Sequence, residues 1–273
     1  MSFKVGYSWV GHQIMNVLSS ISSVLWVLLV ISGTTTVGAA SCRYEDKFYS
    51  TYTCNLTSLS FRNEEDNFLV NDIHVSKYTD NEVLQVSAIQ SRFNFIPNCI
   101  FMKFKNLERL YLYDVKPIII DEKTFKNCLS LKSIHLDFNM ITKLPAKVFQ
   151  ECKNIESIRI VNNEISNIKK DTFKGLYKLT ALRLTHNKIV TINADSFEIL
   201  PQLKVLRLSH NKIKSIHPSA FQFMIHLRNL YLNDNICIDE NYMFDLVDPD
   251  TLTSFLSPFL KKCITNYQLY NDL

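Results

Sequence analysis

Apolar residues recur through the middle of the chain in a 24-residue unit. Leucine or isoleucine fills positions 1, 4 and 6 of each regular unit, as in Leu107, Leu110 and Leu112. The later rows begin at Leu131, Ile155, Leu179, Leu203 and Leu227. Position 9 holds Asn139, Asn163, Asn187, Asn211 and Asn235, and position 19 holds Phe125, Phe149, Phe173, Phe197 and Phe221. A register this strict indicates a one-dimensional stack of repeats.

The spacing within the unit predicts its local structure. Alternation at positions 4 and 6 favours a short strand, and stacked units would place these strands about 4.8 Å apart in a parallel sheet. The amide of the asparagine at position 9 can donate and accept, so it can satisfy backbone groups where the chain turns. The segments between position 9 and the next strand are too short for long helices. One or two turns of α- or 3₁₀-helix are expected there.

The repeat extends beyond its most regular rows. Subtracting 24 from the row at Leu107 recovers a degenerate row that starts at Val83 and carries Ser91 in place of asparagine. We therefore expect about seven rows over residues 83–236. Residues 41–82 lack the repeat and are predicted to form an N-terminal cap, and residues 237–273 a C-terminal cap and tail.

Residues 1–40 are typical of a secretory signal peptide. Lys4 provides a positive charge, an apolar run covers residues 17–31, and small residues precede the expected cleavage after Ala40 or Ala39. A retained signal anchor is the alternative. No second stretch approaches the roughly 20 apolar residues that span a bilayer, so no stable membrane insertion is expected after removal of the signal.

Composition excludes several functions. Only Gly175 of the five glycines lies beyond residue 40, which argues against phosphate-binding loops. The formal net charge of +4 is too small to indicate nucleic acid as a partner. The chain has no nucleophile motif, so we expect no enzyme activity, no cofactor and no metal site.

The unit resembles a known family. The pattern Leu-x-x-Leu-x-Leu-x-x-Asn-x-Ile-x-x-Ile-x-x-x-x-Phe-x-x-Leu over residues 83–236 is similar to the 24-residue leucine-rich repeat of extracellular proteins. This resemblance implies an α/β solenoid, a curved leucine-rich repeat stack with a concave parallel β-sheet. Its convex segments would be short helical, 3₁₀ or irregular. The architecture also resembles secreted insect leucine-rich immune proteins of the type without a coiled coil, which implies a role in innate immunity.

All seven cysteines lie beyond the predicted signal, in a compartment that permits disulfides. By position, Cys42 is expected to pair with Cys54, and Cys237 with Cys263; both pairs look like the caps of the family. Cys128 and Cys152 occupy position 22, normally leucine, in adjacent rows. A bridge between them is conceivable, but inward, parallel side chains favour two buried thiols. Cys99 is expected to pair with another chain or to be shielded near the N-terminal cap.

One sequence feature predicts a modification. Asn55-Leu56-Thr57 is the chain's single N-glycosylation sequon. On a secreted chain we expect Asn55 to be glycosylated, and an unused asparagine is the alternative.

Position 5 is the candidate binding stripe. If positions 4 and 6 point inward, position 5 faces the concave side. Its residues there include Tyr111, His135, Arg159, Arg183, Arg207 and Tyr231. Three neighbouring guanidinium groups repel one another unless anions intervene, and arginine and tyrosine dominate binding hot spots. Solvated arginines are the alternative, and Asp137 and Asp234 could neutralise part of the stripe. His186 and His210, at position 8, are expected to be exposed turn residues rather than metal ligands.

Together these features predict a secreted, extracellular recognition protein. It would bind an extracellular protein or an anionic surface ligand through the concave face and could form a homo- or heterodimer. The alternative is a cell-surface or matrix adhesion module that acts by self-association or receptor binding.

Overall fold

A computed structural model describes residues 39–47, 51–60, 69–70, 74, 78–91, 94–97, 99–116, 118–197, 200–243 and 252–271. Residues 1–38 of the predicted signal peptide lie outside the described residues. The first described strand, β1, begins at Ala39. The predicted boundaries of signal, caps and repeats therefore stay predictions.

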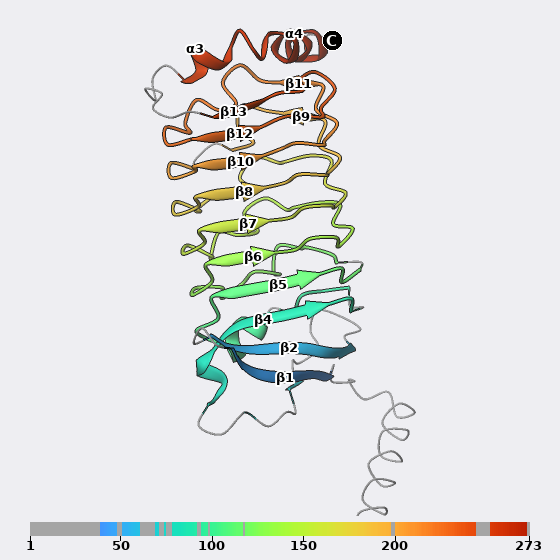
Figure 1. Cartoon of the computed structure of the whole chain (residues 1–273), viewed down its shortest axis with the longest axis vertical. Helices are drawn as coiled ribbons and strands as arrows, with labels where there is room; N and C mark the ends of the chain where they lie inside the picture. Colours follow the sequence, from blue (N-terminus) through green and yellow to red (C-terminus); the bar gives the residue numbers. More distant parts are fainter. Residues whose placement is uncertain are drawn as a thin grey trace, which may run out of the picture. The chain divides into compact units, whose positions relative to one another are not determined.

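The repeats build one continuous sheet (Figure 1). Its strand order in the described residues is β13-β12-β10-β8-β7-β6-β5-β4-β2-β1-β3. The repeat strands are β4 (Val83–Ile89), β5 (Arg109–Tyr113), β6 (Ser133–His135), β7 (Ser157–Arg159), β8 (Ala181–Arg183), β10 (Val205–Arg207) and β12 (Asn229–Tyr231). Neighbouring repeat strands pair in parallel, and Ile134 lies opposite Ile158, its counterpart in the next row. The predicted parallel solenoid with its 24-residue register is thus confirmed.

Other elements cover the ends of the repeat sheet. At the N-terminal end β1 (Ala39–Lys47) pairs antiparallel with β2 (Thr51–Ser60) and parallel with β3 (Leu69–Val70), and β2 pairs parallel with β4. At the other end β13 (Asn241–Met243) pairs antiparallel with β12. Helices α3 (Leu252–Leu256) and α4 (Lys261–Asn271) follow. Residues 261–271 of the predicted C-terminal tail are therefore helical.

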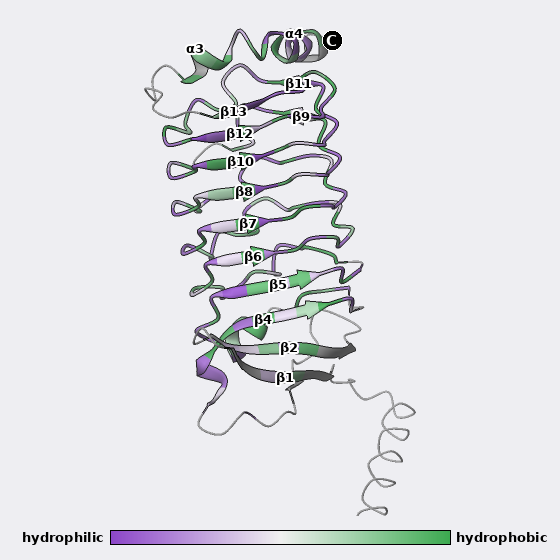
Figure 2. Ribbon diagram, in the orientation of Figure 1, coloured by the Kyte–Doolittle hydropathy of each residue, from purple (hydrophilic) through white to green (hydrophobic). Residues whose placement is uncertain are grey.

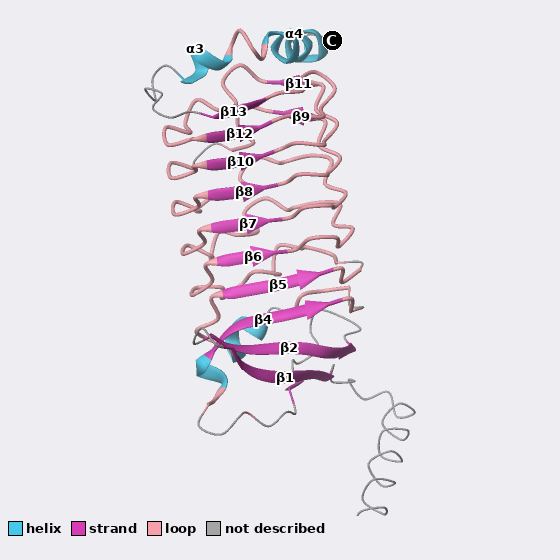
Figure 3. Cartoon of the chain, in the orientation of Figure 1, coloured by secondary structure: helices cyan, strands magenta, loops and turns pink. Residues whose placement is uncertain are grey.

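The segments between strands are mostly turns (Figure 3). Among the described residues, the α-helices lie toward the two ends of the repeats, where α2 (Cys99–Lys103) belongs to the first, degenerate row. The 3₁₀ helix η1 (Asp80–Glu82) precedes this row, and β9 (Thr191–Ile192) pairs with β11 (Ser215–Ile216) outside the main sheet. Figure 2 shows that hydrophobic and hydrophilic residues alternate over short stretches within each repeat. Each repeat is only one strand thick, so inward and outward residues follow one another closely.

The asparagines at position 9 tie each row to the row before it. The Asn187 side-chain amide donates to the backbone oxygen of Ile160, at 2.8 Å, and its oxygen accepts from the backbone N–H of Ile165, at 3.1 Å. Asn163 and Asn211 repeat this pattern with their own preceding rows. These side chains are buried, so the backbone groups that they satisfy have no ready access to water. The predicted role of this asparagine column is confirmed.

The phenylalanines at position 19 form a second column on the other side of the core. Successive ring centroids from Phe125 to Phe149, Phe173 and Phe197 are 5.0, 6.1 and 6.1 Å apart. Each ring is buried and packs on its counterparts in the adjacent rows. The core is therefore a set of stacked columns, and most of its contacts lie between neighbouring rows.

Three disulfides cross-link the described residues. Cys42–Cys54 lies in the N-terminal sheet and Cys237–Cys263 joins the start of the predicted C-terminal cap to α4. The third, Cys128–Cys152, corrects our expectation of two buried thiols. In-register stacking brings the two Cα atoms to 4.9 Å, within the range that a disulfide spans. Side chains that point inward from adjacent rows therefore meet rather than run past each other.

We predict that Asn187→Leu lowers the free energy of unfolding by about 1–3 kcal/mol, because buried backbone groups of two rows lose their partners. Urea unfolding followed by circular dichroism measures the change. Asn187→Asp is a second test, since it keeps the acceptor oxygen but turns a second carboxylate oxygen toward the backbone oxygen of Ile160, so it should also destabilise the fold. Equal midpoints for the wild type and the Leu variant would contradict the role of the asparagine column.

We also predict that the oxidised protein has a single reactive thiol, that of Cys99, when it is unfolded without reductant. The other six cysteines are in disulfides. Thiol titration in guanidinium chloride counts it directly. Three thiols would restore the interpretation of Cys128 and Cys152 as reduced residues.

Replacing both Cys128 and Cys152 by Ala should lower the free energy of unfolding by about 3 kcal/mol, since the bridge no longer restricts the unfolded chain.

Candidate ligand-binding face

The six residues of the predicted stripe are brought together by strand register. Tyr111 pairs with His135, His135 with Arg159, Arg159 with Arg183, Arg183 with Arg207, and Arg207 with Tyr231. Their neighbours at position 4 are buried, so position 5 points to the opposite face, which we name the sheet face. Arg207 is exposed there and the other five are half-buried.

Asp137 neutralises one of the three arginines. Its side chain is 6% exposed and forms an ion pair with Nε of Arg159. The other carboxylate oxygen accepts from the backbone N–H of Val161, at 2.8 Å. These two contacts fix the orientation of the carboxylate, and the carboxylate in turn orients the guanidinium beside it. Arg159 is therefore a fixed and compensated part of the sheet face.

Arg183 and Arg207 lack such compensation. Neither forms an ion pair with a carboxylate among the described residues. Arg183 reaches only the hydroxyl of Ser157, at 3.4 Å, and the guanidinium of Arg207 lies 4.5 Å from the ring centre of Tyr231. Burial, reinforced by Arg207 and Arg159 and opposed by the more distant Asp137, lowers the pKa of Arg183. Two adjacent cations without a counter-ion form a site that an anion would stabilise.

Asp234 does not complete the stripe. It lies 3.3 Å from Nε2 of His210, whose ring stacks on that of His186 at 4.1 Å between centroids. Both histidines have positive φ, 54° and 52°, which is the left-handed turn conformation that histidine tolerates. No group of three or more potential metal ligands occurs in the described residues. The histidine pair is accounted for by the turn at position 8.

Toward the N-terminal end the sheet face is hollowed. A pocket of about 700 Å³ is lined by residues that include Gln85, Ser87, Tyr111, Tyr113, His135 and Asp137. The Tyr111 and His135 rings stack at 4.4 Å and form part of its wall. Burial, together with the cations of Arg159 and Arg183, lowers the pKa of His135 against the opposing effect of Asp137. The pocket wall therefore combines apolar surface with several polar side chains, and burial favours the neutral form of His135.

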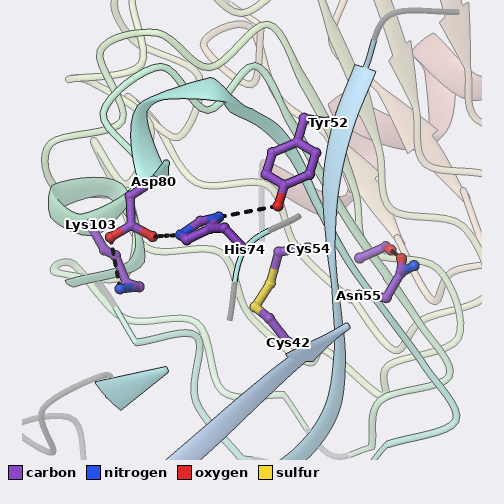
Figure 4. Close-up of a disulfide and its surroundings, with 8 residues drawn as sticks. Cys42, Tyr52, Cys54, Asn55, His74, Asp80 and Lys103 are labelled. Carbon is purple, nitrogen blue, oxygen red and sulfur yellow. Dashed lines mark hydrogen bonds and ion pairs between the residues drawn. A yellow bond between two sulfur atoms is a disulfide. The ribbon is translucent and has the colours of Figure 1, made fainter. Parts of the chain in front are cut away.

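The sequon residue Asn55 also belongs to the sheet face, which sequence reasoning missed. It lies opposite Ser87 in the pairing of β2 with β4 and lines the same pocket. Asn55 and Ser87 are 32 residues apart, so the 24-residue spacing could not place them together. Figure 4 shows Asn55 on the opposite side of β2 from the Cys42–Cys54 disulfide.

A chain of polar side chains lies close to that disulfide (Figure 4). The hydroxyl of Tyr52 lies 3.2 Å from Nδ1 of His74, and Nε2 of His74 lies 3.1 Å from Asp80. Lys103 of α2 pairs with the other oxygen of Asp80, at 2.9 Å. These contacts bind three separate segments to one another. We assign these four side chains a structural role, because each of them has a partner among the other three.

Comparison with known proteins identifies the class. The leucine-rich repeat family model matches residues 105–165, 153–213 and 182–236. With the in-register parallel strands and the asparagine column, this shows that the chain is a leucine-rich repeat protein with 24-residue repeats. No curated protein matches the sequence significantly.

Solved structures share the fold. The leucine-rich repeat domain of APL1 matches with a TM-score of 0.57 and 21% identity, over 72% of this chain and 48% of that one. Toll in its complex with Spatzle, a molecular hub in Drosophila development and innate immunity, matches with a TM-score of 0.50 and 22% identity. That match covers 57% of this chain and 24% of Toll's. The chain thus spans half or less of the length of these two structures.

Among the described residues, no helix has the length and apolar character that crossing a bilayer requires.

We predict that Arg183→Gln raises the pKa of His135, because one of the two cations that oppose its protonation is removed. Titration of the His135 ring protons by NMR measures the midpoint, which in the wild type should lie below 6.5. Because folding lowers this pKa, the related stability is full above pH 6.5 and is lost as the pH falls through the folded-state value. If the titration midpoint of His135 is the same in Arg183→Gln as in the wild type, the charge of Arg183 does not affect the pKa of His135.

Proposed function

We propose that this protein is a secreted recognition protein that binds an anionic group of an extracellular ligand through the sheet face, in innate immunity. Arg183 and Arg207 form the centre of the site, Arg159 is held beside them by Asp137, and Tyr231 supports Arg207. The protein carries out no catalysis. It acts by presenting these side chains on a rigid stack of strands.

The observation that carries this proposal is the pair of adjacent arginines without a carboxylate partner in the described residues. Parallel pairing holds their Cα atoms in neighbouring strands, about 5 Å apart. Folding therefore keeps two guanidinium groups close together at an electrostatic cost that a bound carboxylate, sulfate or phosphate group would offset. Position 5 makes no demand on the core, so the repeat itself does not require arginine there.

Two further observations support secretion and the immune role. Three disulfides are typical of proteins that fold in an oxidising compartment. Of the structures that share the fold, the Toll–Spatzle complex is described as a molecular hub in development and innate immunity. At this low identity the likeness concerns the fold, so the ligand must be argued from the arginines.

We predict that Arg183→Ala/Arg207→Ala weakens binding to a polyanion far more than an equal loss of charge elsewhere. A sulfated polysaccharide column serves as the probe, and the salt concentration at elution is the measurement. The control variant is Lys126→Ala/Lys170→Ala, since both lysines are exposed in turns outside the strands. If the two double variants elute together, net charge alone governs binding and the arginine site is wrong.

Arg159→Ala separates structure from binding. Its removal leaves the buried Asp137 with only a backbone partner, so this variant should lose stability as well as affinity. No buried carboxylate among the described residues pairs with Arg183 or Arg207. Their replacement should therefore leave the unfolding midpoint close to that of the wild type. Capture from extracellular fluid with wild-type and doubly substituted protein then identifies the partner.

A further inference from the structure

The pocket on the sheet face lies beside the chain's glycosylation sequon. Asn55 is half-buried on β2, and the next residue, Leu56, is buried in the core. Alternate residues of a strand point to opposite faces, so Asn55 faces outward with Ser87 and Tyr111. It is therefore the member of the N-terminal cap that continues the position-5 column beyond the first repeat.

The side chain of Asn55 is oriented for attachment. Its oxygen accepts a hydrogen bond from the hydroxyl of Ser87, a contact that does not use Nδ2. N-glycosylation joins Nδ2 to the anomeric carbon of a sugar, while the amide loses a proton and the lipid pyrophosphate carrier leaves. The side-chain oxygen is not consumed. The bond to Ser87 can persist in the glycosylated protein and would hold the first sugar against the sheet face.

The lining of the pocket suits a neutral carbohydrate. Amide, hydroxyl and imidazole groups of Gln85, Ser87 and His135 offer donors and acceptors, and Tyr111 and Tyr113 offer ring surfaces. The charged side chain in this lining is Asp137, whose carboxylate is already engaged by Arg159 and Val161. The volume of about 700 Å³ falls within the usual range for a ligand pocket.

We propose that Asn55 carries an N-linked glycan whose first sugars cover this pocket and leave the arginine pair as the open part of the sheet face. The inference rests on secretion, which the proposed function includes, because the transfer requires the secretory pathway. It divides the sheet face into a sugar-covered N-terminal part and a cationic C-terminal part. A ligand would then approach across Arg183 and Arg207 rather than across Tyr111.

The test uses the full chain secreted from cultured insect cells. Peptide mass spectrometry, before and after amidase treatment, reports the glycan on Asn55. Thr57→Ala removes the sequon, and Thr57→Ser is the matched control that keeps it. Tyrosine nitration then reports coverage, because Tyr113 lines the pocket and is 44% exposed, whereas Tyr177 lies outside the pocket lining and is 56% exposed.

We expect a glycan on Asn55 in the wild type and in Thr57→Ser, with several-fold less nitration of Tyr113 than in Thr57→Ala and equal nitration of Tyr177. If Thr57→Ala does not fold, enzymatic removal of the glycan from the folded wild type gives the same comparison. Secreted protein with an unmodified Asn55, or equal nitration of Tyr113 with and without sugar, would overturn the inference. Absence of the chain from the medium would instead overturn the secretion proposed for the protein.

Discussion

The structure depends on the hydrogen bonds that each row can make only with its neighbours. A row contains one short strand and several turns, so most of its backbone groups find no partner inside the row. The strand pairs with the strands on either side, and the asparagine at position 9 reaches back to the preceding row. Any row that slipped by one residue would lose both sets of contacts and turn its apolar side chains to water.

This constraint explains how much of the molecule could be predicted from its sequence. The stack, the strand positions, the asparagine column and the order of side chains along position 5 all follow from one spacing. The same spacing brings Arg159, Arg183 and Arg207 into adjacent strands. Predictions are accurate where a residue's surroundings are set by its counterparts in the neighbouring rows.

Features that depend on finer geometry or on irregular spacing were not predictable. The repeat places Cys128 and Cys152 in the correct column. Whether their parallel side chains form a disulfide depends on the distance between the two Cα atoms, 4.9 Å, which the sequence pattern does not give. Asn55 lies outside the repeat, so only the structure could reveal it beside Ser87. The division of the arginines into one compensated and two uncompensated groups depends on which way Asp137 and Asp234 turn.

The three disulfides divide the solenoid unequally. They cross-link the N-terminal sheet, two early repeats and the C-terminal end, so no covalent bridge joins the described residues of the rows from Ile155 to Asn235 to one another. Those rows are held together by strand hydrogen bonds, the asparagine column and core packing alone, and they carry the arginine pair. An anion bound between Arg183 and Arg207 would therefore act as a non-covalent cross-link between two rows. Occupancy of the site would stiffen a stretch of the stack that these disulfides do not cross-link.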